Sequence, residues 1–328
     1  MRRIFVFTIF LAAVFTAVRF NDAVAEEPLY IQNLSPAGGM SFPAPRTAAV
    51  LEKGSNMILL NTSLANHFVI QESENERLFL DGQTTKITME WRRSLTDKLD
   101  ISLSIPMISQ NNGFLDSEIS NWHSFWGLPD GDRQYFQNDE LSYSYQTPSI
   151  NLDFSSPRTG VGDIALFSNY LAYSSSVLKA SFSSGIMFSS GESNSFLGAG
   201  SEQISFAAHL SSLSQDTNGF EWNLHAGYAY STSDWFSMKN TERLRWFSGV
   251  SLTKKISERF SALIQLDAHH RLADNAIKPL GRLAALLSLG LRYRVSEKWI
   301  LDISFSEDIK VESAPDITFN GTLRYSWK

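Results

Sequence analysis

The 328-residue sequence contains no cysteine. Disulfides, thiolate metal sites and thiol catalysis are therefore excluded, and so is a lipid anchor attached to a cysteine. Runs of basic residues are also lacking, and 28 Lys and Arg residues stand against 34 Asp and Glu residues. Because nucleic-acid binding needs many phosphate contacts, this balance gives no support to a nucleic-acid partner.

Long apolar runs are missing after the first 25 residues. Arg2 and Arg3 precede an apolar run over residues 4–18, and the small-residue pattern Ala23-x-Ala25 follows it. An apolar run of about 15 residues is short for a spanning helix, which needs about 20, and this order is typical of a cleaved secretory signal. We therefore predict that residues 1–25 are a signal peptide and that the mature chain begins at Glu26.

Helical periodicity is scarce from about residue 55 onward, where apolar and polar residues alternate instead. In one stretch Trp299, Leu301 and Ile303 alternate with Ile300, Asp302 and Ser304. Alternation of this kind places successive side chains on opposite faces of a strand. Twelve such segments begin near Ser55, Leu78, Leu99, Gly160, Ser176, Ser201, Phe220, Arg243, Arg259, Leu283, Lys298 and Asp316.

The connectors between these segments alternate between tight turns and longer loops. An even strand count with short turns at one end predicts an all-β fold, namely a transmembrane antiparallel up-and-down β-barrel of the outer-membrane type over residues 55–328. The alternative is a secreted β-sandwich, which also alternates. Five outward aromatic residues at the ends with tight turns favour the barrel, since they form an interfacial girdle: Trp91, Tyr293, Trp299, Tyr325 and Trp327.

Two terminal segments complete the predicted organisation. Residues 26–54 contain four prolines and are expected to form an extended periplasmic arm or a small plug that enters the lumen. The last strand ends in Tyr325 and Trp327, which resembles the signal read by the barrel assembly machinery. The expected partners are this machinery, outer-membrane lipid and lipopolysaccharide of a Gram-negative bacterium.

If the apolar face contacts lipid, the other face lines the lumen and carries more arginines than carboxylates. These residues either brace the wall by pairing across strands or form a pore whose positive field favours anionic or polar solutes. The predicted lumen charges are Glu90, Arg92, Arg243, Arg245, Asp267, His269, Arg292, Arg294, Asp302 and Arg324.

Catalytic and metal-binding patterns are weak. His209-Leu210-Ser211 has the spacing of a lipase pair in twelve-stranded barrels, but the alternation turns both polar residues into the lumen, near the periplasmic end. Asp130-Gly131-Asp132 fails the calcium-loop pattern, because that frame places Tyr135 and Leu141 where Gly and Glu are required. We expect no enzyme activity, no metal and no cofactor.

The longest connector, residues 109–159, contains the most aromatic-rich passage. Asp116 is a suitable N-cap for a short helix, and Gly127 is suited to end it. An isolated helix of this length is marginal and must pack on another surface. The candidate residues for a lid or a solute contact are Trp122, His123, Phe125, Trp126 and Tyr135.

The motifs "FWGLPDGDR" and "TGVGDIALFSNY" resemble an uncharacterised family of Gram-negative outer-membrane proteins, catalogued as a domain of unknown function (DUF3187). The resemblance covers most of the mature chain from "PLYIQNLSP" at Pro28. It implies the barrel fold and an outer-membrane location but no activity. More distantly, "GVGDI" resembles outer-membrane proteins of aromatic-degradation pathways and the fatty-acid channel group, which implies uptake of hydrophobic small molecules.

The expected function is passive uptake or binding of small solutes, among them hydrophobic ones, by an outer-membrane barrel of unspecified role. The first alternative is a closed structural or surface-interaction barrel. The second is an outer-membrane lipid enzyme.

Overall fold

The computed structural model describes residues 25–36, 42–127, 133–214, 219–234, 241–309 and 313–328, without the side chains of Trp122, His123 and Trp126. The predicted signal peptide therefore falls almost wholly outside the described residues. Two helices, α1 (Asp116–Trp126) and α2 (Lys278–Gly281), are present in the described part. Neither has the length and apolar character that a bilayer-spanning helix needs.

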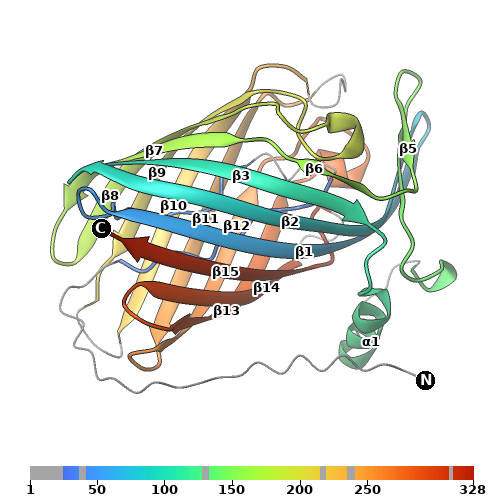
Figure 1. Ribbon diagram of the computed structural model, residues 1–328. Coiled ribbons are helices and arrows are strands. Elements are labelled where there is room, and N and C mark those ends of the chain that lie inside the picture. The colour runs from blue at the N-terminus through green and yellow to red at the C-terminus, as the bar shows by residue number, and fades with distance from the viewer. Residues whose placement is uncertain (1–24, 37–41, 128–132, 215–218, 235–240, 310–312) are drawn as a thin grey trace.

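Twelve antiparallel strands form a closed barrel (Figure 1). Pairing of β1 with β15 closes the sheet, so the wall leaves no free strand edge. This architecture confirms the predicted fold class. The barrel strands are β1 (Asn56–Ser73), β2 (Glu76–Thr96), β3 (Leu99–Asn111), β7 (Ala165–Ser174), β8 (Leu178–Met187), β9 (Gln203–Ser212), β10 (Phe220–Ser231), β11 (Leu244–Lys255), β12 (Phe260–His269), β13 (Ala284–Arg294), β14 (Trp299–Asp308) and β15 (Ile317–Trp327).

The outer face of the barrel is apolar, as the period-two pattern requires. Leu291 and Ile303, which pair in register on neighbouring strands, expose 59% and 62% of their surface, whereas the inward Asp302, next to Ile303 on β14, exposes 2%. Outward aromatic rings gather where the turns are tight: Trp299 stacks near Tyr325, with ring centroids 4.5 Å apart. A continuous apolar wall with an aromatic girdle suits a lipid bilayer and would be unfavourable in water.

We call the two ends of the barrel the short-turn end, where the chain terminates, and the long-loop end, where α1 lies (Figure 1). The long connection between β3 and β7 contains more strand than the alternation predicted. Its elements, besides α1, are the 3-10 turn η1 (Arg133–Tyr135), β4 (Ser142–Gln146), β5 (Asn151–Phe154) and β6 (Arg158–Val161). A second 3-10 turn, η2 (Ser193–Ser195), lies between β8 and β9.

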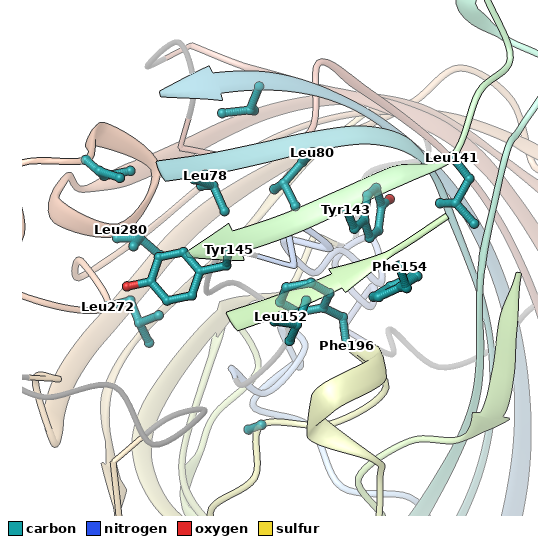
Figure 2. Packing of buried hydrophobic residues seen from close by; sticks show 13 residues of the cluster. Leu78, Leu80, Leu141, Tyr143, Tyr145, Leu152, Phe154, Phe196, Leu272 and Leu280 are labelled. Carbon is teal, nitrogen blue, oxygen red and sulfur yellow. The ribbon is translucent and has the colours of Figure 1, made fainter. Parts of the chain in front are cut away.

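The β4–β5 hairpin folds over the long-loop end and forms an apolar cluster, which we call the cap (Figure 2). It pairs with β2 along Arg77–Asp81, beyond the part of β2 that pairs with β3. The cap is buried between the hairpin, the barrel wall and the loops, and its apolar side chains cover the long-loop end of the barrel. Its members are Val69, Leu78, Leu80, Leu141, Tyr143, Tyr145, Leu152, Phe154, Phe196, Ala199, Leu272, Ile277 and Leu280.

We call residues 26–54 the N-terminal segment; its described residues up to Leu51 run inside the barrel, whereas residues 52–54 are exposed. The described residues of the segment contain neither helix nor strand, and Leu29, Phe42 and Ala48 are 1%, 6% and 0% exposed. The described residues of the segment contact inward-facing wall residues on β2, β3, β7, β9–β13 and β15. The lumen is therefore filled by the chain's own N-terminal segment and not only by the side chains of the wall.

Candidate functional site

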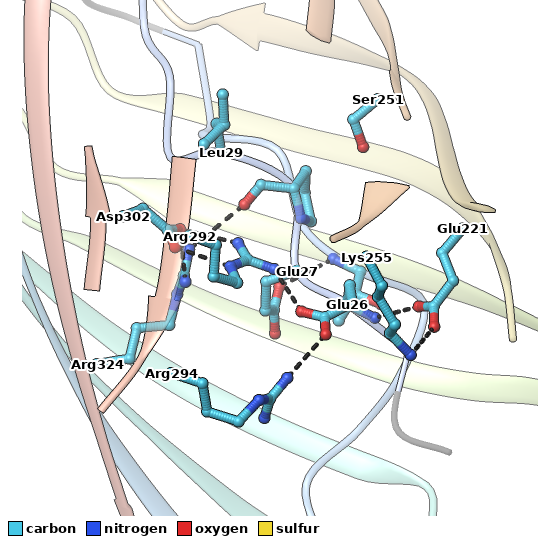
Figure 3. Close-up of polar contacts among 12 residues, drawn as sticks. Glu26, Glu27, Leu29, Glu221, Ser251, Lys255, Arg292, Arg294, Asp302 and Arg324 are labelled. Atoms are coloured by element: carbon cyan, nitrogen blue, oxygen red, sulfur yellow. Dashed lines mark hydrogen bonds and ion pairs between the residues drawn. The ribbon is translucent and has the colours of Figure 1, made fainter. Parts of the chain in front are cut away.

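The most densely charged part of the lumen lies at the short-turn end, around the first residue of the N-terminal segment (Figure 3). Glu26 is 6% exposed. One of its carboxylate oxygens lies 2.6 Å from an Arg292 nitrogen, and the other lies 2.7 Å from Arg294. The two arginines are alternate residues of β13, so the pleat turns both toward the lumen.

Asp302 on β14 is the wall carboxylate of this cluster. It binds Arg292 at 2.7 Å and Arg324 of β15 also at 2.7 Å. Register pairs Asp302 with Arg292 on one side, while Arg324 comes from the strand on the other side. Arg324 additionally donates to the carbonyl of Pro28 at 3.4 Å. Three neighbouring strands thus converge on the beginning of the segment.

The main chain of Glu26 is bound as well. Its backbone nitrogen donates to a Glu221 oxygen at 3.0 Å, and its carbonyl accepts from the Asn223 amide at 3.0 Å. Lys255 lies 2.7 Å from the other oxygen of Glu221. Residue 26 is therefore held through its side chain by β13 and through its main chain by β10.

A second charged group, centred on Arg92, fixes the segment to β2 and β3 near both of its ends. Arg92 lies 2.8 Å from Glu27 and 2.6 Å from Asp100, and it donates to the carbonyl of Ala49 at 2.6 Å. Arg92 is 2% exposed. One guanidinium thus links both limbs of the segment to the wall, which suits its planar arrangement of several donors.

Residues 46–48 of the segment make a further set of polar contacts with the wall. Arg46 pairs with Glu90 at 2.8 Å, and the Thr47 and Ser211 hydroxyl oxygens are 3.1 Å apart. The Ser211 hydroxyl also accepts from the backbone nitrogen of Ala48 at 2.8 Å. These contacts are short and polar, and they hold the segment against β2 and β9.

Toward the long-loop end the segment presents an aromatic ring to the wall. Phe42 stacks on His269, with ring centroids 4.4 Å apart, and Arg245 lies 5.0 Å above the same ring. The Asn33 amide lies 3.0 Å from His269 Nε2. Cation–π and stacking contacts of this kind favour a defined position for the ring.

Histidines and a carboxylate on the wall do not assemble a catalytic triad in the described residues. The Ser183 hydroxyl lies 2.7 Å from His209 Nε2, while Asp267 lies nearest to another histidine, His225, at 3.7 Å. Ser211 is engaged by the N-terminal segment. The described residues also contain no group of three or more His, Asp or Glu that could hold a metal ion.

The structure describes all ten residues that were predicted as lumen charges. Nine of them point inward: Glu90, Arg92, Arg245, Asp267, His269, Arg292, Arg294, Asp302 and Arg324. The prediction for Arg243 is wrong. It precedes β11 at the long-loop end, its side chain is 48% exposed, and it pairs loosely with Asp234 at 3.5 Å, because the chain leaves the wall there and alternation no longer sets its direction.

The predicted lid residues are only partly described. Phe125 and Tyr135 are each 76% exposed and line no part of the lumen, and the side chains of Trp122, His123 and Trp126 lie outside the described part. Helix α1 begins at Asp116, as expected. The Asp116 carboxylate pairs with Arg133 and accepts from the Asn66 amide at 2.8 Å, so it pins the loop to the rim of β1.

Electrostatics favour an ionised Glu26 in this setting. Burial alone raises the pKa of its carboxyl, but Arg292 and Arg294 outweigh burial and hold the pKa below the usual 4.5. The group is therefore charged at neutral pH, and its pairing with the arginines is a full ion pair.

Several important residues were not predicted as site residues. Glu26, Glu27 and Arg46 lie in a segment without periodicity, so nothing in the pattern assigned them partners. Glu221 and Lys255 occupy inward positions of β10 and β11, and the alternation of Phe220 and Trp222 with polar residues was a signal that could have revealed Glu221.

The chain shares its fold with a solved outer-membrane channel. The COG4313 outer membrane channel from Pseudomonas putida F1 has a TM-score of 0.55 and 12% identity, over 87% of this chain and 100% of that chain. The CymD monoaromatic hydrocarbon channel has a TM-score of 0.40 and 12% identity, over 84% and 88%. The Ralstonia pickettii toluene transporter TbuX has a TM-score of 0.40 and 8% identity, over 85% and 90%.

No curated protein sequence matches the chain. A family model matches residues 4–327, which include the barrel, the N-terminal segment and the long connection. The chain therefore belongs to the family described as "Protein of unknown function (DUF3187)".

Proposed function

We propose that the protein is an outer-membrane channel for small solutes, and that residues 26–54 are its gate. The observation that carries the proposal is how the segment is held. Its described residues form no strand pairing with the wall and are bound by side chains and single hydrogen bonds. The segment is therefore able to leave the lumen without breaking the ladder that closes the barrel.

The cap supports solutes with apolar character. Tyr143, Phe154 and Phe196 pack against one another at the long-loop end, with ring centroids 5.5 to 6.0 Å apart, where a solute arriving from outside would meet the barrel. Binding sites for small apolar molecules are lined by such side chains. The fold shared with the COG4313 channel is consistent with transport.

The proposed location is the outer membrane of a Gram-negative bacterium, after removal of residues 1–25. Lipid and lipopolysaccharide would contact the apolar wall, and the barrel assembly machinery would read β15. Cell fractionation tests the location, and gel migration with and without boiling tests the barrel. Recovery in the soluble periplasm with identical migration would contradict both.

A disulfide lock tests the gate, because the chain is free of cysteine. Thr47→Cys with Ser211→Cys places two thiols where the hydroxyl oxygens are 3.1 Å apart, which is close enough for a bridge. In planar bilayers we expect the oxidised double variant to conduct less than the same protein after reduction. Each single-cysteine variant is a control, and its conductance is expected to be the same before and after reduction.

The rival function is a sealed barrel with a structural or surface-interaction role, which the filled lumen and the cap also favour. Deletion of residues 26–50 separates the two. A folded deletion variant that conducts supports the channel. A folded deletion variant that does not conduct, even when residues 142–154 are also removed, would contradict the channel and favour the sealed barrel.

A further inference from the structure

The carboxylate of Glu26 is bound in the manner of a ligand. Each oxygen contacts a different arginine of β13, Arg292 at 2.6 Å and Arg294 at 2.7 Å. Arrangements in which a carboxylate spans two guanidinium groups are geometrically specific and stronger than neutral hydrogen bonds. Arg292 and Arg294 thus bind a carboxylate, and in this structure that carboxylate belongs to Glu26 of the same chain.

The wall alone carries excess positive charge at this place. Asp302 is shared by Arg292 and Arg324, each at 2.7 Å, and Arg294 lies next along β13. With Lys255 and Glu221 included, four wall cations thus face two wall carboxylates in this cluster. Because excess positive charge in a largely buried place is costly, departure of Glu26 favours entry of another anion.

A cavity of about 120 Å³ lies beside the arginines at the short-turn end. One side of it is formed by Arg292, Arg294 and Arg324. Its apolar lining includes Val50, Leu51, Met57 and Ile300, and Glu27, Glu297 and Lys298 also contribute to the lining. A ligand that fits both sides has an anionic head and a short apolar tail.

We propose that Arg292 and Arg294 form a binding site for a small amphiphilic carboxylate, which Glu26 occupies when the N-terminal segment is docked. The tail of the ligand lies in the neighbouring cavity. Ligand and Glu26 exclude each other, so binding releases the first residue of the segment. The inference deepens the proposed function, on which it rests: the transported acid loosens the gate that blocks it.

Calorimetry with hexanoate as the probe tests the site without any conductance measurement. The neutral hexanamide has the same tail and is the control ligand. We expect Glu26→Gln to bind hexanoate at least about tenfold more tightly than the unmodified protein, because a tethered competitor has been weakened. Hexanamide is expected to bind neither protein measurably.

Arg294→Gln in the Glu26→Gln background identifies the head-group contact. Arg294 is a quarter exposed, so its replacement leaves the more buried Arg292 in place, and gel migration with and without boiling verifies folding. Hexanoate affinity is expected to fall about tenfold, the loss of one charge-assisted pair, and Arg294→Lys is expected to restore part of it. Equal affinity for hexanoate and hexanamide, or no gain in Glu26→Gln, overturns the proposal.

The two proposals fail in different ways. Tight hexanoate binding that leaves the conductance of the unmodified protein unchanged would retain the site and reject the gate. A disulfide lock that controls conductance, together with absent hexanoate binding, would retain the gate and reject the carboxylate site.

Discussion

Arg92 offers a quantitative test of how firmly the N-terminal segment is docked. It binds the Glu27 carboxylate at 2.8 Å and the Ala49 carbonyl at 2.6 Å, and the wall carboxylate Asp100 at 2.6 Å. Arg92→Lys keeps the positive charge beside Asp100, but one ammonium does not reproduce the branched contacts of the guanidinium. The substitution therefore removes mainly the two contacts to the segment.

Each contact involves a charged group and is worth about 1.5 kcal/mol or more, so docking is expected to weaken by about 3 kcal/mol. A tenfold change corresponds to about 1.4 kcal/mol, so the undocked fraction rises about 100-fold. Ala48 is 0% exposed, and Ala48→Cys introduces a single thiol into a chain without others. The rate at which a maleimide labels this thiol reports the undocked fraction.

We expect Arg92→Lys to raise the labelling rate of Ala48→Cys about 100-fold. Arg93→Lys is the matched control, because Arg93 follows directly on β2 and is exposed on the outer face. Equal labelling rates in all three proteins would refute the reasoning, since Arg92 would then contribute nothing to docking. A comparable rise in Arg93→Lys would attribute the effect to a general loosening of the barrel.

Three further predictions concern pH, processing and the wall. The pKa of the Glu26 carboxyl in the docked segment lies below the usual 4.5. Its contribution to docking is therefore complete above about pH 4.5 and is lost as the pH falls through the lower pKa of the docked state. We expect the conductance to stay low at about pH 5 and to rise only in stronger acid. Mass spectrometry of the exported protein should find Glu26 as the first residue; its free ammonium group would then lie 3.0 Å from Glu221, and Glu221→Gln should speed labelling of the buried thiol. Gly249→Ala should lower the thermal unfolding midpoint by several degrees relative to the wild type, because the added Cβ would lie 2.3 Å from an Asp267 oxygen and overpacking of that kind costs about 1–3 kcal/mol; an unchanged midpoint would mean that the wall yields there without cost.

The barrel itself was predictable, because alternation is a local property of the sequence. Predicted strand starts at Leu99 and Phe220 coincide with those of β3 and β10, and the helix predicted from Asp116 is α1. The β4–β5 hairpin was missed although Tyr143 and Tyr145 alternate with serine, since both strands are short. Short strands leave too few alternating positions to stand out from a loop.

The sequence indicated which types of residue face the lumen, but it did not indicate which residues pair with one another there. Inward arginines on β13 and β15 follow from the strand pattern, but the pairing of Arg292 with Glu26 joins residues 266 positions apart. No periodicity in residues 26–54 indicates which side chains meet the wall. Arg243 failed for the opposite reason, because a local rule was extended past the end of the strand.

The contacts of Glu26 also order the events of folding. Glu26 is bound by β10 and β13, and it is separated from Glu221 by 195 residues and from Arg294 by 268 residues. Its contacts can therefore form only after nearly the whole chain has been synthesised. Contacts of such high sequence separation form late. Ala25, at the predicted cleavage site, is 3% exposed in the closed barrel, and a protease needs that bond accessible. Cleavage at the predicted site would therefore have to precede docking of Glu26 against β10 and β13, because the docked segment hides the bond.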